Sequence, residues 1–249
     1  MDSITVRVLG SGTASGHGGR FQTCFWIESP GWKFLLDCGA TSMTAIKKNR
    51  LVPSVIDTML ITHLHGDHFG GIPFFILDAQ FSKRESPLII AGPPGIQDRT
   101  RETMEALFPK SSETRQRFLI EFIELSPERP TSIGPLRVTA YPVIHFCGAP
   151  PYALRVECAG RTIAYSGDTE WTDSLIAAAN GADLFICEAY QFDKKVKYHL
   201  DYQTLLAHQA TLGCKRLVLS HMGSDMLSRV GGIRVETAYD GMVIESRSE

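Results

Sequence analysis

The sequence lacks the features that mark secreted, membrane-bound and strongly basic proteins. None of its apolar runs approaches the length of a membrane span, and the chain starts with a charged, strand-like segment where a signal peptide would be apolar. The six cysteines, at positions 24, 38, 147, 158, 187 and 214, form no CxxC pair and mostly lie within apolar runs, as reduced core thiols do. A formal net charge of −2 argues against a globally basic nucleic-acid binder but leaves a local basic patch open. We therefore predict a cytoplasmic protein that makes no membrane contact.

The chain of 249 residues suffices for one large α/β domain or two small ones. Strand patterns occur at residues 3–9, 23–28, 33–37, 57–62, 88–91, 118–125, 136–143, 152–158, 162–165, 183–187 and 216–220. Helical patterns occur at residues 41–49, 72–81, 96–107, 172–179 and 201–212, and a closing segment runs through residue 243. The second half loosely repeats the order of the first, with no linker between them. This order predicts two sheets packed face to face with helices outside, as one domain over residues 1–249.

A dense group of metal-ligand residues follows the apolar strand at 57–62. His63, His65, Asp67 and His68 lie within six residues, at the end of that strand where sites in α/β proteins tend to lie. In an extended segment His63, His65 and Asp67 point the same way, whereas His68 begins the next helix and points to an adjacent position. The four side chains can therefore serve two neighbouring zinc, manganese or iron ions. The alternative, a His-rich surface loop, leaves the abrupt change from strand to cluster unexplained.

Three further residues could complete such a site. His145, Asp168 and His221 each stand at the polar end of an apolar strand. A single residue of this kind is more often a turn or capping residue. Three such residues, in a chain that already carries the cluster, favour the ligand interpretation because a two-metal site needs more ligands than the cluster supplies.

These residues, in this order, resemble the H-x-H-x-D-H hallmark and the remote ligands of the metallo-β-lactamase superfamily. The resemblance is strongest to the branch that holds ribonuclease Z, arylsulfatase-like enzymes and small cyclic phosphodiesterases. It spans almost the whole chain, from the strand-end Asp37 through residues 62–71 and 166–169 to residues 238–242. It implies a four-layer αβ/βα sandwich of two mixed β-sheets flanked by helices.

The resemblance also implies a ligand set for two divalent ions, with zinc expected first and manganese or iron also admitted. His63, His65 and His145 would hold one ion, and Asp67, His68 and His221 the other, with Asp168 as the bridge. Asp67 would count among the catalytic groups as well. Two such ions would lower the pKa of a bound water, giving a metal-bound hydroxide that attacks a phosphoryl or carbonyl centre.

A carboxylate and a histidine outside the ligand set carry a second resemblance. Glu188, at the end of the strand at 183–187, and the later His199 are similar to the glutamate and proton-donating histidine of ribonuclease Z-like enzymes. This implies that His199 is a general acid oriented by Glu188. The residues after His199 depart from the family pattern, so a surface position at a helix start stays open for it. Asp37 could orient a ligand histidine or cap the helix at 41–49.

The resemblance leaves several functions to weigh. We predict a binuclear phosphodiesterase that acts on a small or short nucleotide phosphodiester. Ribonuclease Z carries a long arm that grips tRNA between the residues that match His145 and Asp168, and here little more than a hairpin joins them. Large structured RNA is therefore a less favoured partner, and a tRNA 3′-processing enzyme without the arm is the alternative. A lactonase, an arylsulfatase-type hydrolase and a metal-binding regulator also stay open. A homodimer is expected from the resemblance.

Overall fold

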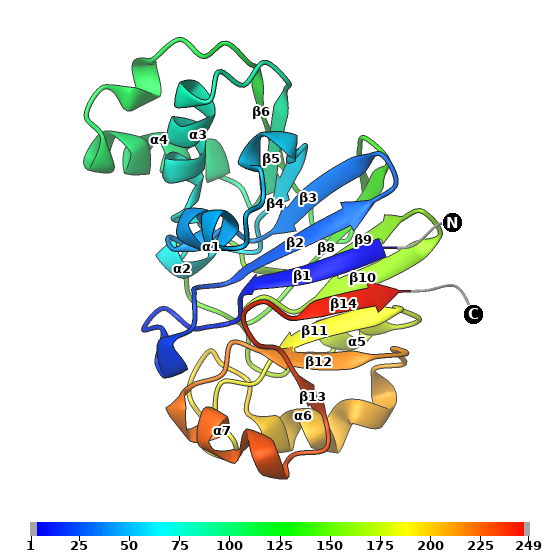
Figure 1. The fold of residues 1–249 in the computed structure, drawn as a ribbon. Helices are drawn as coiled ribbons and strands as arrows, with labels where there is room; N and C mark the ends of the chain where they lie inside the picture. The colour runs from blue at the N-terminus through cyan, green and yellow to red at the C-terminus, as the bar shows by residue number, and fades with distance from the viewer. Residues whose placement is uncertain (1–3, 247–249) are drawn as a thin grey trace.

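The computed structural model describes residues 4–246, which form two facing β-sheets with helices on the outer sides (Figure 1). In spatial order, the first sheet consists of β14 (Val243–Ser246), β1 (Ile4–Gly10), β2 (Cys24–Ser29), β3 (Trp32–Leu36), β4 (Thr58–Leu60), β5 (Leu88–Gly92) and β6 (Ile120–Glu124). The second consists of β13 (Glu236–Thr237), β12 (Leu217–Ser220), β11 (Leu184–Glu188), β10 (Arg161–Tyr165), β9 (Tyr152–Cys158), β8 (Leu136–Pro142) and β7 (Thr131–Ile133).

Both sheets are mixed in the same way. In the first, β14 to β3 pair antiparallel and β3 to β6 pair parallel. In the second, β13 to β10 pair parallel and β10 to β7 pair antiparallel. The parallel strands β4, β11 and β12 are buried along their whole length, which explains why each appears in the sequence as an unbroken apolar run.

The helices form the two outer layers. The helices on the side of the first sheet are α1 (Ser42–Lys48), α2 (Gly66–Phe69), α3 (Ile72–Phe81) and α4 (Ile96–Leu107). Those on the side of the second are α5 (Ser174–Ala179), α6 (Tyr202–His208) and α7 (Ser224–Arg229). Short 3₁₀ turns occur at His17–Gly19, Pro53–Val55, Ser111–Glu113, Gln209–Thr211 and Val230–Gly232. Among residues 4–246, no helix has the length and apolar character needed to cross a membrane.

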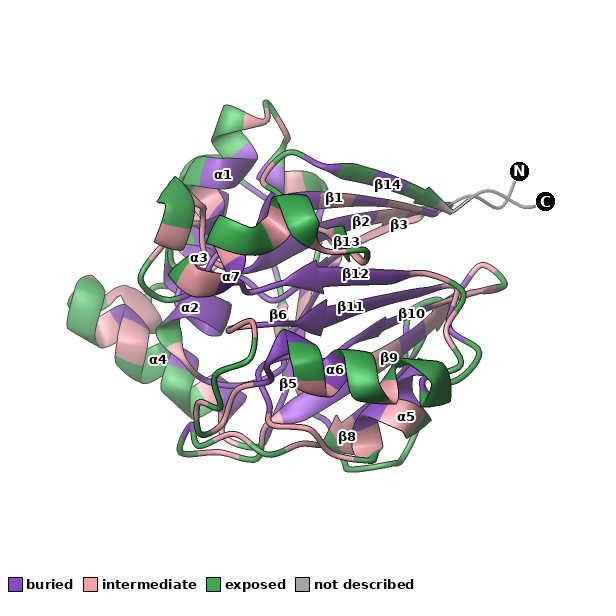
Figure 2. Cartoon of the chain, turned by 90° about the horizontal axis from the view of Figure 1, so that it is seen from below, coloured by how far each residue is buried: buried purple, intermediate pink, exposed green. Residues whose placement is uncertain are grey.

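Three apolar cores hold these layers together. The central core lies between the sheets, where the rings of Phe25 and Tyr165 meet edge to face with centroids 5.3 Å apart. A second core lies between the first sheet and its helices, and a third between the second sheet and its helices. Figure 2 shows the strands mostly buried and the outer helices exposed on their solvent side. The predicted four-layer sandwich of two mixed β-sheets is therefore confirmed.

The two sheets place the candidate site residues at one edge of the sandwich. His63 follows β4, and Asp37 follows β3, in the first sheet. His145, Asp168 and His221 follow β8, β10 and β12 in the second sheet. The carboxyl ends of parallel strands meet at one edge of a sheet, so residues far apart in the sequence come together there.

The structure differs from the predicted secondary structure in three places. Asp67 does not continue an extended segment, because α2 begins at Gly66 and places Asp67 in its first turn. The predicted closing segment instead contains α7, β13 and β14, of which β14 pairs antiparallel with β1. The predicted helix at 201–212 is also shorter, since α6 ends at His208 and a 3₁₀ turn follows it.

Candidate metal centre

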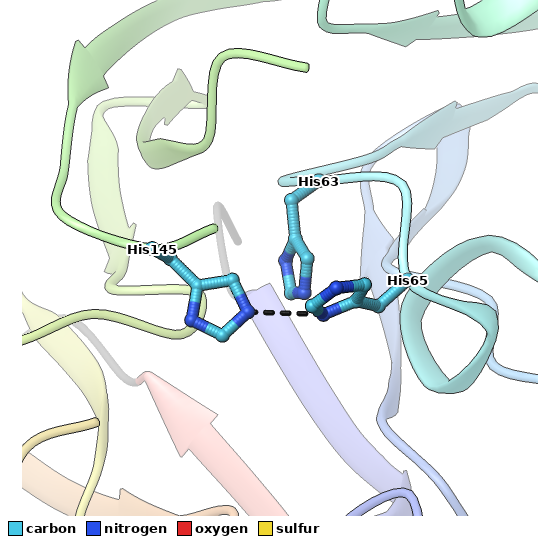
Figure 3. A group of neighbouring side chains, drawn as sticks. All are labelled: His63, His65 and His145. Atoms are coloured by element: carbon cyan, nitrogen blue, oxygen red, sulfur yellow. Dashed lines mark hydrogen bonds between the residues drawn. The ribbon is translucent and has the colours of Figure 1, made fainter. Parts of the chain in front are cut away.

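Three histidines form one group of potential ligands, here called the open set. His63 and His65 come from the loop after β4, and His145 comes from the loop after β8, as Figure 3 shows. His145 Nε2 lies 3.0 Å from His65 Nδ1, and one nitrogen of each ring lies within 4.8 Å of the others. His63 is buried, whereas His65 and His145 are half-buried. The open set thus presents three converging nitrogens, two of them on a partly exposed face.

Two carboxylates and two histidines form a second group, here called the buried set because all four are buried. Its members are Asp67, His68, Asp168 and His221. The Nε2 atom of His68 lies 3.3 Å from Asp168 Oδ1 and 3.5 Å from Asp67 Oδ2. The Nε2 atom of His221 lies 3.2 Å from Asp168 Oδ2. This is the grouping that the resemblance implies. It differs from the extended-segment expectation, which set Asp67 beside His63 and His65, since α2 begins at Gly66 and Asp67 lies in its first turn.

Asp168 lies between the two sets. Its Oδ2 atom is 3.9 Å from Nε2 of His63, a member of the open set, and 3.2 Å from Nε2 of His221 in the buried set. A single carboxylate can therefore contact both groups of ligands. This is the geometry that a bridging ligand between two ions requires.

Several buried polar atoms of the two sets have no hydrogen-bond partner within residues 4–246, and a metal ion would supply a partner. Among the described residues, His63 Nε2, His68 Nε2 and Asp168 Oδ1 are buried polar atoms without a hydrogen-bond partner. A buried polar group left in this state costs about 1–3 kcal/mol. Two ligands that share a tetrahedral zinc ion at about 2.1 Å lie roughly 3.4 Å from each other. The separations within the buried set are close to this value, so an ion would satisfy the unpartnered atoms without moving them far.

The pKa values of four histidines suit metal binding. Burial lowers the pKa of His63 well below its usual value, and it also lowers the pKa of His65 and of His145. Burial lowers the pKa of His221 to about 4, although the Asp168 carboxylate opposes this shift. These rings are therefore neutral near pH 7, and a neutral imidazole is the form that binds a metal.

In the buried set, neighbouring charges outweigh burial in setting the pKa values of Asp67, Asp168 and His68. Burial would raise the pKa of Asp67 and Asp168, but neighbouring histidines, His68 and His221 above all, outweigh it and lower both values, that of Asp67 to about 2. Burial alone would lower the pKa of His68, but the carboxylates of Asp168, Asp67 and Asp37 raise it well above its usual value. The buried set therefore demands a positive charge at its centre. A proton on His68 supplies it here, and a divalent ion would supply it more fully.

Each buried ring has its second nitrogen held by a neighbour. Asp37 Oδ2 lies 2.7 Å from His68 Nδ1, while Oδ1 of the same carboxylate accepts a hydrogen bond from the Thr62 backbone N–H at 2.8 Å. Thr23 Oγ1 lies 3.3 Å from His221 Nδ1. Such contacts fix the orientation of a ligand ring. The capping alternative for Asp37 is wrong, since α1 starts after Thr41 and has no side-chain cap.

Two rings of the open set are held in place, one by a backbone carbonyl and one by a threonine hydroxyl. His145 Nδ1 donates to the Tyr198 carbonyl oxygen at 2.8 Å, and Thr62 Oγ1 lies 3.0 Å from His63 Nδ1. The sequence patterns did not point to Thr23 or to the Tyr198 carbonyl. A threonine at the start of an apolar strand and a backbone oxygen carry no distinctive sequence signal.

Glu188 and His199 form a hydrogen-bonded pair beside the two sets. Glu188 Oε2 lies 3.0 Å from His199 Nδ1, and the Thr169 backbone N–H donates to the other carboxylate oxygen. His199 Nδ1 is also 3.9 Å from Asp168 Oδ2, and the side chain is only 20% exposed. The helix-start alternative for His199 is wrong, because Asp201 caps α6 by accepting from the Thr204 backbone N–H.

The Glu188–His199 pair retains a proton at neutral pH. Burial and the charge of Asp168 raise the pKa of Glu188 to about 8. Burial lowers the pKa of His199, but its hydrogen bond with Glu188 and the charge of that carboxylate outweigh burial and raise the value to about 9. Both shifts favour the protonated pair, which titrates as a unit. The His199 ring is further held by Tyr190, whose ring stacks on it with centroids 4.6 Å apart. His199 also lies within 4.8 Å of His145 and Asp168, as a third potential ligand group.

Comparison with known proteins identifies relatives over almost the whole chain. The family described as Anti-Pycsar protein Apyc1 matches residues 4–237. Ribonuclease Z of Limosilactobacillus fermentum is 26% identical over 260 residues, which cover 83% of this chain and 81% of that protein. The structure of human tRNase Z, short form, matches this chain with a TM-score of 0.79 at 28% identity. The match covers 96% of this chain and 98% of the human one.

A further structural neighbour supports the fold. The metallo-β-lactamase fold protein YhfI from Bacillus subtilis has a TM-score of 0.77 at 21% identity, covering 99% of this chain and all of the other. The match to the family extends over more than nine-tenths of the sequence, and the match to the ribonuclease Z of Limosilactobacillus fermentum covers 83% of it. The chain therefore belongs to the Anti-Pycsar protein Apyc1 family and is a ribonuclease Z-like member of the metallo-β-lactamase superfamily.

Proposed function

We propose that this protein is a binuclear, metal-dependent phosphodiesterase that acts on a small or flexible phosphodiester, with cyclic nucleotides as the first candidates. The observation that carries the proposal is the Glu188–His199 pair, hydrogen-bonded at 3.0 Å and only 3.9 Å from the carboxylate of Asp168. Cleavage of an unactivated phosphodiester expels an alkoxide, which is a poor leaving group, and a positioned proton donor assists its departure.

The ligand roles follow from the two sets. His63, His65 and His145 would hold one divalent ion, Asp67, His68 and His221 the other, and Asp168 both. When bound, two such ions would polarise a water for attack and balance the negative charge that grows on the phosphoryl oxygens. Zinc is our first choice, with manganese and iron admitted by the same ligands.

His199 would act on the leaving group. Its Nδ1 atom is engaged by Glu188, so the proton at Nε2 is the one available for transfer. Glu188 keeps the ring in this orientation and stabilises the charged imidazolium. The raised pKa of His199, about 9, keeps the donor protonated at neutral pH. Asp37 and Thr23 would hold the ligand rings of His68 and His221 in position.

A second candidate function is cleavage of RNA, because the curated relatives are named ribonuclease Z and a structural neighbour is named tRNase Z. The same ligands and the same proton donor would serve that reaction. The segment between His145 and Asp168 consists chiefly of the hairpin β9–β10, which offers no long arm to grip a structured RNA. The matching family is named Anti-Pycsar protein Apyc1. We propose that this chain, like that family by its name, acts against Pycsar.

Three further properties belong to the proposal. We expect the whole chain to work as one domain, in the cytoplasm, and as a homodimer. Light scattering on the purified protein tests the dimer, and a mass of one chain would contradict it.

A substrate panel on metal-replete protein tests the function. It should contain bis(p-nitrophenyl) phosphate, 3′,5′-cyclic nucleotides of several bases, precursor tRNA, lactones and aryl sulfates. Hydrolysis of the phosphodiesters with a cyclic nucleotide as the best natural substrate is the expected result. Faster cleavage of precursor tRNA would establish the second candidate, and activity confined to lactones or sulfates would contradict both.

A further inference from the structure

An exposed aromatic residue stands directly beside the open set. Phe146 follows the potential ligand His145, and 72% of its surface is exposed. A single exposed apolar residue is ordinary on a protein surface and indicates nothing by itself. Phe146, however, stacks on a second aromatic ring, that of Tyr198, with centroids 6.2 Å apart and planes at 29°. Tyr198 in turn precedes the proton donor His199.

The two rings are tied to the metal centre through the backbone. His145 Nδ1 donates to the Tyr198 carbonyl, and the Tyr198 N–H donates to Glu170 Oε1 at 2.8 Å. The Glu170 N–H donates to the Ile144 carbonyl at 3.0 Å, which closes the link between the two loops. Tyr198 has a φ of +70°, a conformation that non-glycine residues adopt at a cost of roughly 1 kcal/mol or more. The contacts therefore hold Phe146 and Tyr198 at a fixed place relative to the potential ligands.

A positive charge accompanies the rings. The Nζ atom of Lys197 lies 4.6 Å from the centroid of the Tyr198 ring, and the lysine is exposed. The residues before and after Tyr198 in the chain, Lys197 and His199, line a cavity together with Trp171 and others. An aromatic surface next to an ammonium group suits a ligand that carries both a flat ring and a negative charge.

We propose that Phe146 and Tyr198 form a stacking platform that binds the base of a nucleotide substrate. This rests on the proposed function and assigns two residues of this chain to the recognition of the base. The phosphodiester lies at the two ligand sets, the base lies on the exposed face of Phe146, and Lys197 attracts the anionic ligand. Stacking on an aromatic face tolerates different bases, since each base has a π surface. The platform therefore selects nucleosides over alkyl or sugar groups more than it selects one base over another.

A pair of esters with the same leaving group tests the platform. The p-nitrophenyl ester of thymidine 5′-phosphate carries a base, whereas methyl p-nitrophenyl phosphate does not. We expect Phe146→Leu, which keeps an apolar side chain but removes the ring, to lower the ratio of kcat/KM for the two esters about tenfold. Phe146→Tyr should keep the ratio within about twofold of wild type because the ring remains. An unchanged ratio in Phe146→Leu would overturn the platform.

A matched control separates this effect from a general loss of exposed aromatic surface. Phe81 is 81% exposed at the end of α3 and is not among the residues that line the metal centre. Phe81→Leu is expected to leave the ratio at its wild-type value. An equal fall in both variants would show that the ratio reports something other than stacking, and the proposal would fail.

A binding measurement keeps the platform testable even if the protein cleaves neither ester, an outcome that would count against the proposed function. Calorimetric titration of metal-replete protein with adenosine 5′-monophosphate and with ribose 5-phosphate isolates the contribution of the base. We expect the nucleotide to bind about tenfold more tightly, and Phe146→Leu to abolish the difference. Equal affinities in the wild-type protein would overturn the platform whatever the activity.

Discussion

The open set and the buried set would surround a divalent ion with two different environments. The open set consists of three histidines whose pKa values are lowered, and two of them are partly exposed. The buried set contains two carboxylates, and none of its members is exposed. Neutral ligands at an open face hold an ion without cancelling its charge, which leaves it able to attract an anionic substrate. Carboxylates in a buried site cancel more of that charge and retain the ion more firmly. We infer from this difference that a substrate would approach from the side of the open set.

The largest effect is expected from removing the residue that joins the two sets. Asp168→Ala deletes the carboxylate that contacts both His63 and His221, so the protein should lose metal from both sets. We expect phosphodiesterase activity to fall on the order of 10³-fold or more, measured with metal content by mass spectrometry. Asp193→Ala, at an exposed loop residue, is the control and should leave both quantities unchanged. Full metal content in Asp168→Ala would contradict the bridging role.

The proton donor should separate substrates by their leaving groups. His199→Ala removes the proposed acid beside the open set, so esters with alkoxide leaving groups should slow about 10²-fold or more. Esters of p-nitrophenol should slow only a few-fold, because that leaving group departs without a proton. Rates plotted against leaving-group pKa check this, and equal losses on both kinds of ester would rule out the acid role.

The same donor sets the dependence on pH. His199 has a pKa raised to about 9, so the protonated donor is present at neutral pH and is lost as pH rises through that value. The rate for alkoxide esters should therefore fall about tenfold per unit above that pH. This alkaline fall should be missing in His199→Ala, which retains only slow, donor-independent cleavage of these esters.

Asp37 sharpens the comparison because the ligand ring that it contacts directly, that of His68, belongs to the buried set, whereas it reaches His63 of the open set only through Thr62. Asp37→Ala frees His68 Nδ1, and we expect the affinity of the buried set for its ion to fall about 10–100-fold. The open set, whose His145 is held by a backbone carbonyl, should keep its ion. Asp57→Ala is a suitable control, since that carboxylate accepts from the Lys33 backbone N–H just before β4, away from the ligands. Titration with zinc should show one weakened site, and loss at both sites would contradict the separation of the two sets.

The smallest effect is expected at Thr23. Thr23→Val keeps the shape of the side chain but removes the hydroxyl 3.3 Å from His221 Nδ1. Because one hydrogen bond contributes about 1 kcal/mol, activity should fall roughly threefold to fivefold. Steady-state kinetics at saturating zinc measure this. A fall in activity of more than about tenfold would contradict a role for Thr23 limited to one hydrogen bond.

The sequence was most informative where one local pattern decides the structure. The helices at 72–81 and 96–107 were predicted with the bounds that the structure has, because apolar spacing and a proline or glycine before each start define them. The cluster after β4 was recognisable because metal ligands rarely gather at the end of a buried strand by chance. The remote residues His145, Asp168 and His221 were recognisable for the same reason, and the structure brings all three to the cluster.

The sequence was least informative where distant segments decide the structure. Strand β14 exists because it pairs with β1, more than two hundred residues away, and no local pattern marks it. Helix α2 has four residues, too few for a helical period to appear, which is why an extended segment was expected to set Asp67 beside His63 and His65. The choice between two roles for Asp37 needed the position of His68, since the same carboxylate can cap a helix or hold a ring.

The number and place of bound ions test the central claim most directly. Anomalous diffraction from crystals of zinc-replete protein should show two peaks, one among His63, His65 and His145 and one among Asp67, His68 and His221, with Asp168 in contact with both. A single peak, or two peaks of which one lies outside these residues, would contradict the two-ion centre on which the proposed phosphodiesterase rests.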